Sequence, residues 1–300
     1  MSALAVIVAI IVGVWLVASL ESWVSTGRFR PGRPLTAAVA MLGQESLVPR
    51  RPDRILFEIA PPILLAAGVA ATTVLPLAPD VIAIDLATGG LFINAAWVYV
   101  VVALIMAGWG PDGAYAMVAG WRFLAQLVAY AMLTVMPITA VAMRAESLST
   151  TAIVASQASG AWNAITQPLG FVLFWLAAMA ACFLPPFDHP IAPTELAGGV
   201  TAEYTGVRLA IFRLGRLVLI LTLATAVTVF FLGGWLGPWL PGWAWTAAKT
   251  LAVVAAMLWL GRWVPRLRTE HLMEWSWKLG IPLALANILW VGVTLWVVDR

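Results

Sequence analysis

The hydrophobic positions of this chain gather into long continuous runs that are separated by short polar connections. Each run has about 20 or more mostly apolar residues, the length at which a helix crosses the hydrocarbon core of a bilayer. The runs are rich in Ala, Leu and Val. We therefore predict an all-α polytopic membrane protein with about eight transmembrane helices, over residues 4–24, 55–76, 91–110, 115–142, 152–184, 207–234, 244–264 and 276–297.

Two other kinds of membrane segment fit this pattern less well. A membrane β-barrel is built from short segments of alternating polarity, whereas the runs here are continuous. The first run is too long for the apolar core of a signal peptide and lacks a basic segment before it, so we expect a retained helix. Residues 1–300 then form a single membrane domain, in which 25–54 make a basic loop and 183–206 make an acidic loop.

The basic residues are distributed unequally between alternate connections. Arg144, Lys249 and Arg300 belong to one set, and Arg122 lies inside a predicted helix. The remaining 13 of the 17 Lys and Arg residues belong to the other set: Arg28, Arg30, Arg33, Arg50, Arg51, Arg54, Arg208, Arg213, Arg216, Arg262, Arg266, Arg268 and Lys278. The positive-inside rule places this second set in the cytoplasm, and both termini on the non-cytoplasmic side.

The composition supports the membrane class and excludes several functions. Hydrophobic residues make up 62% of the chain, charged residues 10%, and the mean hydropathy is +0.95. The net charge of +3 comes from the basic loops, so no basic soluble domain exists to bind nucleic acid. The single cysteine, Cys182, excludes an internal disulfide and a cysteine-ligated iron–sulfur cluster in this chain. Two histidines are too few for a haem- or copper-rich oxidase subunit, and we predict no metal site.

Polar side chains within the predicted helices are candidates for function, because an ionisable group is costly inside a bilayer. Arg122 and Gln126 are four residues apart and therefore share one helix face. They either line an interior cavity or tie helices together through carbonyl groups or a carboxylate. Lone asparagines are better suited to hydrogen bonds between helices, and we expect that role for Asn94, Asn163 and Asn287.

The acidic loop, FLPPFDHPIAPTELAGGVTAEYTG, places Asp188, Glu195 and Glu203 between two apolar runs. Its prolines exclude a regular helix over 185–193. If the residues after Pro193 are helical, Glu195 and Glu203 lie about 80° apart around the axis and face one chamber. Irregular backbone near membrane depth is tolerated where it is buried in protein or lines a wet cavity. The alternative is an ordinary solvated loop, and the sequence leaves both interpretations open.

Several motifs of this chain resemble, in order, those of the H subunit of respiratory complex I. That family includes mitochondrial subunit 1 and the membrane anchors of energy-converting hydrogenases. The acidic loop carries the most specific motifs: Pro-Phe-Asp at 186–188, Glu-Leu at 195–196 and Glu-Tyr-Thr-Gly at 203–206. The other similar segments are LFEIAPPI (56–63), DLATGGL (85–91), AGWGPDGAYAMVAGWRFLAQLVAY (107–130), FLGGW (231–235) and PRLRTEHLMEWSWKLGIPLALAN (265–287).

The resemblance implies a membrane-anchor subunit that shapes a chamber for the quinone headgroup and links the redox arm to proton translocation. It implies that the chain binds no cofactor, that quinone is the substrate class, and that partner subunits carry the iron–sulfur clusters. The implied partners are other membrane-arm subunits, the quinone-facing hydrophilic subunits and the lipid bilayer. No residue is expected to be catalytic in the strict sense, and whether the chain itself counts as an enzyme stays open. The proton-path or chamber candidates are Asp188, Glu195, Glu203, Tyr204, Arg122, Gln126, Arg266 and Arg268.

The chain also departs from the family pattern at titratable positions. Ala131 stands where the family has a glutamate, Pro193 stands at another carboxylate position, and the stretch 181–185 lacks a glutamate and an arginine. Two alternatives to the chamber role therefore stay open. One is a docking scaffold that does not pump, and the other is the anchor of a hydrogenase or ferredoxin-linked complex without quinone. The arginine-rich composition suggests a bacterium, and we expect the inner (plasma) membrane.

Overall fold

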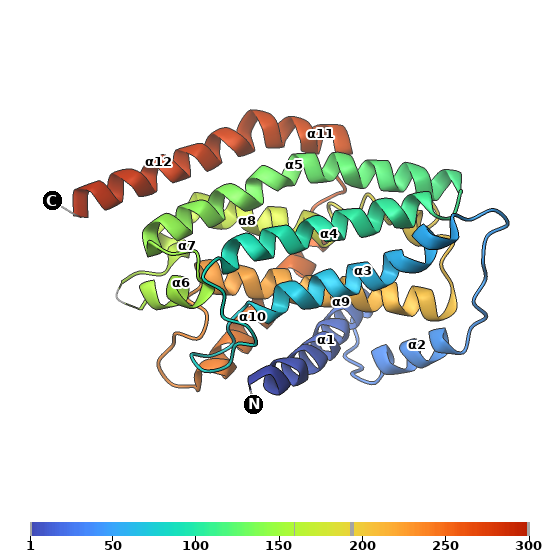
Figure 1. Cartoon of the computed structure of the whole chain (residues 1–300), viewed down its shortest axis with the longest axis horizontal. Coiled ribbons are helices and arrows are strands. Elements are labelled where there is room, and N and C mark those ends of the chain that lie inside the picture. Colours follow the sequence, from blue (N-terminus) through green and yellow to red (C-terminus); the bar gives the residue numbers. More distant parts are fainter. Residues whose placement is uncertain (1, 159, 193–194, 299–300) are drawn as a thin grey trace.

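A computed structural model describes residues 2–158, 160–192 and 195–298, and the regular elements within them are all helices (Figure 1). In chain order they are α1 (Ser2–Thr26), α2 (Arg33–Leu42), α3 (Arg54–Thr73), α4 (Gly89–Trp109), α5 (Ala114–Ala145), α6 (Thr150–Ser156), α7 (Asn163–Thr166), α8 (Pro168–Ala181), the 3-10 turn η1 (Gly199–Thr201), α9 (Gly206–Phe231), α10 (Gly242–Trp263), α11 (Thr269–Trp275), the π-helical turn η2 (Ser276–Gly280) and α12 (Ile281–Val298).

Within the described residues, seven helices are long and apolar enough to cross a membrane. They are 20 to 32 residues long, and the last of them is a continuous segment made of α11, η2 and α12. Since a helix rises 1.5 Å per residue, roughly 20 residues suffice for the hydrocarbon core of a bilayer. The structure thus confirms the prediction of an all-helical polytopic membrane protein.

The helix expected over 152–184 is interrupted. The structure divides this run into α6, the four-residue α7 and the 14-residue α8. Proline has no N–H to bond the preceding turn but is favoured in the first turn of a helix, so Pro168 begins α8 and cannot continue an earlier helix. Consequently α8 is shorter than any of the seven crossing helices.

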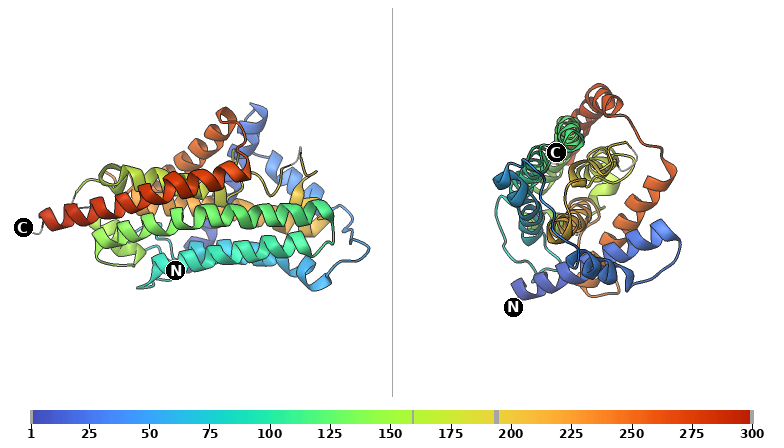
Figure 2. Two further views of the ribbon diagram at one scale, coloured as in Figure 1. Left: turned by 90° about the horizontal axis from the view of Figure 1, so that it is seen from above. Right: turned by 90° about the vertical axis from the view of Figure 1, so that its right-hand side faces the viewer.

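Helix α9 lies in the middle of the bundle (Figures 1 and 2) and is the most enclosed of the seven, because 83% of its most apolar 18-residue stretch is buried. It packs against α3, α10, α1 and α8. Small residues permit its close approach to α3: a Cβ on Gly68 or on Gly215 would lie 3.0 or 3.1 Å from a side chain of the other helix. The hydroxyls of Thr72 and Thr222 meet in the same interface at 2.6 Å.

The lone asparagines have different roles. Asn163 donates to a carbonyl of α9 at 2.7 Å, and Asn287 of α12 accepts from the amide of Gly170 in α8 at 3.2 Å. The prediction of bonds between helices is confirmed for these two. It is wrong for Asn94, whose amide donates to the carbonyl of Gly90 in its own helix. A side chain can reach the carbonyl four residues earlier, so a polar residue in a helix need not seek a neighbour.

One end of the bundle gathers the polar segments. The amide of Asp53 donates to the carbonyl of Gly110 at 2.8 Å, and the amide of Leu47 donates to the hydroxyl of Thr205 at 2.8 Å. The basic loop is thereby fixed to the α4–α5 turn and to the acidic loop; its helix α2 and the start of α3 lie at the right of Figure 1. We call this the arginine-rich end.

Candidate functional site

The first half of the acidic loop is buried although its backbone is irregular. Phe187, Asp188 and His189 are each less than a tenth exposed. The interpretation as an ordinary solvated loop is therefore wrong for this half. Glu195 and Glu203, in the second half, are exposed.

Gly199 closes the loop on itself. The amide of Val200 donates to the carbonyl of Pro190 at 3.0 Å, and Gly199 adopts φ +56° beside it. A Cβ on Gly199 would lie 2.0 Å from that carbonyl oxygen. Only glycine fits this position, because it tolerates the left-handed backbone and has no side chain to clash.

A helix after Pro193 was the condition for Glu195 and Glu203 to share a helix face, and this condition is not met. Pro193 itself lies outside the described residues, and beyond it the only regular helix before α9 is η1. Glu195 and Glu203 therefore do not share a helical face. The Glu203 carboxylate instead lies beside the α4–α5 turn, where a Cβ on Gly113 would be 3.4 Å from its Oε1. The glycines after Glu195 break the helix, since they favour turns at this spacing.

Gln126 of α5 holds the loop from inside the bundle. Its Nε2 donates to the carbonyls of Ala180 at 2.8 Å and Phe187 at 2.9 Å, and its Oε1 lies 3.1 Å from Nδ1 of His189. The side chain is fully buried. Gln126 thus supplies a donor to the carbonyl of Phe187 in the irregular backbone, where an unpaired buried carbonyl would be costly, and adds a second donor to the carbonyl of Ala180, which also accepts from the amide of Phe183.

Asp188 pairs with Arg266, which lies in the connection between α10 and α11. Oδ2 of Asp188 lies 2.6 Å from Nη2 of Arg266. The Asp188 side chain is 10% exposed and the Arg266 side chain is 35% exposed. Within the described part of the chain, the other oxygen of Asp188, Oδ1, is buried and accepts no hydrogen bond. The amide of Leu267 also donates to the carbonyl of Pro186, which adds a second link between this connection and the loop.

Glu195 pairs with Arg122 of α5 at 2.7 Å, at a more exposed position. The hydrogen bond from Arg122 lowers the pKa of Glu195 below its ordinary value, although burial opposes this. A carboxyl that is held ionised by an arginine is a poor proton carrier near neutrality. The raised pKa that a low-dielectric chamber would produce is not found at Glu195.

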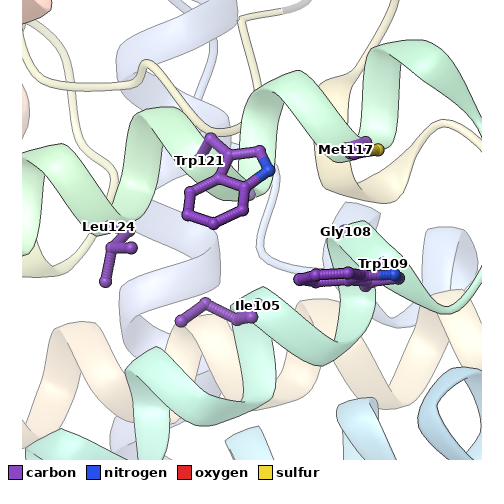
Figure 3. Close-up of a pocket in the computed structure, with 7 residues that line it drawn as sticks. Ile105, Gly108, Trp109, Met117, Trp121 and Leu124 are labelled. Atoms are coloured by element: carbon purple, nitrogen blue, oxygen red, sulfur yellow. The ribbon is translucent and has the colours of Figure 1, made fainter.

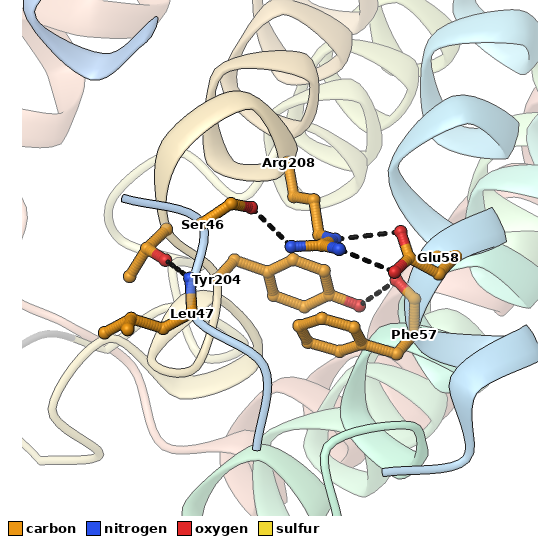
Figure 4. Close-up of polar contacts among 7 residues, drawn as sticks. Ser46, Leu47, Phe57, Glu58, Tyr204 and Arg208 are labelled. Carbon is orange, nitrogen blue, oxygen red and sulfur yellow. Dashed lines mark hydrogen bonds and ion pairs between the residues drawn. The ribbon is translucent and has the colours of Figure 1, made fainter. Parts of the chain in front are cut away.

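Tyr204 is buried at the arginine-rich end, where it completes the hydrogen bonding of α3. Its hydroxyl donates to the carbonyl of Phe57 at 3.1 Å, and its ring stacks on the Phe57 ring at 4.5 Å (Figure 4). In a regular helix that carbonyl would accept from residue 61, but Pro61 has no N–H to give. Burial raises the pKa of Tyr204, so the hydroxyl stays protonated and remains a donor.

Arg208 of α9 forms a two-pronged ion pair with Glu58 of α3 beside Tyr204 (Figure 4). Its Nε and Nη2 lie 2.8 and 2.6 Å from the two carboxylate oxygens, and its Nη1 donates to Ser46. Glu58 was not among the site residues predicted from the sequence. The signal was present, since a lone acid one turn inside an apolar helix is costly without a partner.

A cavity of about 360 Å³ lies between α1, α9, α10 and the first half of the acidic loop. Its polar lining consists of Ser25, Asp188, Arg262 and the Glu21–Arg216 ion pair, whose atoms are 2.9 Å apart, and the remaining lining is mostly apolar. Sequence reasoning missed Glu21, which lies in the first apolar run, and assigned Arg216 and Arg262 to membrane topology alone. The lone acid in that run was the available signal.

A second, smaller hollow of about 70 Å³ lies between α4 and α5 (Figure 3). Trp109 and Trp121 flank it with ring centroids 6.0 Å apart, and Gly108 and Gly120 let the two helices approach. Its lining is apolar apart from the indole N–H groups, and both tryptophans are about half exposed. It has the character of a lipid-facing groove, since it offers no titratable side chain.

The predicted site residues are thus distributed over four places. Five of them lie at the acidic loop: Asp188 and Glu195 belong to it, and Arg122, Gln126 and Arg266 bind it from other segments. Tyr204 lies with Arg208 near α3, and Glu203 is apart from both groups. Arg268 is exposed at the start of α11 and, among the described residues, forms no ion pair. Within the same residues no group of three or more His, Cys, Asp or Glu could hold a metal ion.

Comparison with known proteins gives a consistent family. The family model described as NADH dehydrogenase matches residues 4–292. The second NADH-quinone oxidoreductase H subunit of Geobacter metallireducens is 34% identical over 282 residues, which is 87% of this chain and 82% of that protein. The NADH-quinone oxidoreductase H subunit of Syntrophotalea carbinolica is 37% identical over 266 residues (86% and 80%), and that of Geobacillus kaustophilus is 36% identical over 272 residues (89% and 81%).

Proposed function

This chain belongs to the H-subunit family of NADH-quinone oxidoreductases, and on that premise we propose that it is the membrane-anchor subunit of a complex I-like redox assembly. Its cavity receives a quinone headgroup from the bilayer. The acidic loop beside the cavity links the redox arm to proton translocation. The electrons come from iron–sulfur clusters of partner subunits, and this chain supplies the wall, the charges and the membrane anchor.

The cavity beside Asp188 is the observation that carries this proposal. Its volume is within the range of about 300–1,000 Å³ that is typical of small-molecule sites, and its lining combines apolar surface with a few polar groups. In the described part of the chain, Asp188 Oδ1 lacks a donor and Arg216 Nε lacks an acceptor. A quinone carbonyl can accept from the arginine, and a quinol hydroxyl can donate to the aspartate after a small movement of either side chain.

The arginine-rich end faces the cytoplasm in this proposal, and both termini face the other side of a bacterial inner membrane. The basic loop, the acidic loop and the α10–α11 connection then form the surface on which the hydrophilic redox subunits dock. The excess of arginine at this end supports the orientation, because basic residues are retained on the cytoplasmic side. The other membrane-arm subunits would cover exposed apolar surface of the helices.

One observation favours a second function, a docking scaffold that does not move protons. Four acids near the cavity and the loop are each paired with an arginine: Glu21 with Arg216, Glu58 with Arg208, Asp188 with Arg266 and Glu195 with Arg122. An arginine does not give up its proton and favours the ionised form of its partner. Such pairs hold segments together well but exchange protons poorly.

The experiment uses the whole complex, purified from its native membrane together with its partner subunits. A photoreactive quinone analogue is expected to label residues that line the cavity, and Asp188→Asn to reduce both labelling and quinone reduction at least tenfold. The matched control is Glu270→Gln, which changes an exposed acid of α11 outside the cavity. Labelling at another place, with unchanged quinone reduction in Asp188→Asn, would leave the scaffold function. A hydrogenase among the co-purifying subunits, without quinone reduction, would contradict both functions and favour the anchor of a membrane-bound hydrogenase.

A further inference from the structure

His189 lies between two oxygen atoms that can only accept hydrogen bonds. Its Nδ1 is 3.1 Å from Oε1 of Gln126, and its Nε2 faces the backbone carbonyl of Leu267. The side chain is buried, with His189 only 7% exposed, so solvent does not replace either contact. The histidine connects the acidic loop to α5 on one side and to the α10–α11 connection on the other.

The orientation of the Gln126 amide is fixed by its other contacts. Its nitrogen donates to the carbonyls of Ala180 and Phe187. If the amide were turned round, its oxygen would face these two carbonyl oxygens, and no hydrogen bond would remain between them. The amide oxygen therefore faces His189, which meets an acceptor on each side of its ring.

A neutral imidazole has one N–H and one bare nitrogen, so it can serve only one of two acceptors. A doubly protonated ring serves both. We propose that His189 is a proton-binding site and that its doubly protonated ring ties the acidic loop to α5 and to the α10–α11 connection. Loss of the proton removes one of the two hydrogen bonds and loosens the loop.

The charges around His189 are otherwise balanced. Asp188 is its neighbour in the chain and pairs with Arg266 of the α10–α11 connection. Glu195, from the second half of the loop, pairs with Arg122, one turn from Gln126 on α5. A proton on His189 therefore adds one positive charge to a local set of zero net charge. A change in either neighbouring pair would alter the charge that faces the protonated ring.

The short α10–α11 connection is held to the acidic loop by several contacts, of which the one with His189 is one. Leu267 offers both of its backbone groups to the acidic loop, the amide to Pro186 and the carbonyl to His189. Arg266, the preceding residue, adds the ion pair with Asp188. The inference goes beyond the proposed function, since it holds whether or not the cavity receives a quinone.

The protonation state can be measured directly, because the chain has only two histidines. The full chain is labelled with ¹⁵N-histidine, reconstituted in lipid bilayers, and compared with its His271→Gln variant to assign the two rings. At neutral pH we expect two protonated ring nitrogens for His189. A spectrum with one protonated and one bare nitrogen would overturn the proposal. No substitution at His189 is needed, so a failure to fold cannot confuse the result.

The contact between His189 and the α10–α11 connection is tested by hydrogen exchange of the peptide that contains Leu267. In the full chain, His189→Leu should increase the exchange rate of that peptide roughly fivefold, the effect expected from the loss of one hydrogen bond. His189→Gln, which keeps a neutral donor, should give an intermediate rate. His271→Gln is the control for a histidine that is exposed and lies in α11. Exchange that is unchanged in His189→Leu would show that the histidine does not hold this connection.

Discussion

Asp188 of the acidic loop and Arg266 of the α10–α11 connection form an ion pair 2.6 Å long, although 78 residues of the chain separate them. The pair lies at the boundary of the cavity, where the carboxylate is nearly buried and the arginine reaches toward the surface. Neither side chain belongs to a regular helix. The contact thus positions two irregular segments that the helices alone would leave free to move.

The first prediction concerns this pair. Arg266→Gln leaves the Asp188 carboxylate nearly buried without its cation, so we expect a loss of roughly 1–3 kcal/mol in the free energy of unfolding, less than for a fully buried pair. Arg266→Lys should lose less, because the charge is kept. The double variant Asp188→Asn with Arg266→Gln should recover part of the loss. The measurement is equilibrium unfolding in mixed micelles. Equal losses in the single and double variants would contradict a direct interaction.

The second prediction concerns pH and the Glu195–Arg122 pair. The pKa of Glu195 is lowered in the folded state, so the pair stabilises the protein above the ordinary pKa range of glutamate. That contribution disappears as the pH falls through the lowered pKa. Since Glu195 is 57% exposed, we expect Arg122→Gln to cost at most about 1 kcal/mol at pH 7 and nothing near pH 2. Unfolding at both pH values, with and without 0.5 M salt, checks this. A cost that grows on acidification would have the wrong sign.

The third prediction concerns Tyr204 and the proline it compensates. Tyr204→Phe removes the hydroxyl that donates to the Phe57 carbonyl, and we expect a loss of about 1–2 kcal/mol. In a Pro61→Ala background the helix regains its own N–H donor, so the same change should cost much less. A double-mutant cycle of unfolding free energies measures the coupling between the two positions. A cost that is the same in both backgrounds would mean that Tyr204 acts only by packing.

The fourth prediction compares two glycines. Gly199→Ala places a methyl group against the carbonyl of Pro190 in a left-handed backbone, so we expect the acidic loop to refold locally and the stability to fall by about 2 kcal/mol or more. Gly292→Ala in α12 meets nothing within 4 Å and should be neutral or slightly stabilising. Unfolding midpoints and protease sensitivity of the loop distinguish the two. Similar behaviour of both variants would contradict the turn geometry.

Hydropathy alone was enough to predict the helical membrane class, because each crossing helix must satisfy its own backbone over about 20 apolar residues. It failed at α6 to α8, where composition stays apolar while the backbone turns. The local cause was visible at Pro168, but its outcome depends on tertiary contacts such as those of Arg144 with Asn163.

The candidate site was predictable in part, because polar residues are easily recognised in an apolar sequence. The acids of the loop stand out in an apolar sequence, and Arg122 and Gln126 share a helix face. The Glu21–Arg216 pair was missed because its members are 195 residues apart, and no periodicity connects them. The role of Tyr204 depends on a missing N–H at Pro61, which can be recognised only when both are seen in space.

The depth of the acidic loop has an electrical consequence. Gln126 lies about 18 Å along the axis of α5 from the start of that helix, and it contacts His189 and the carbonyl of Phe187. The loop thus descends well into the bundle. Charges at Asp188 and His189 would then lie part of the way across the insulating layer, where the membrane voltage acts on them. One elementary charge that crosses the whole bilayer core gains about 2.3 kcal/mol per 100 mV, so a charge that moves within this loop is expected to contribute a fraction of that energy.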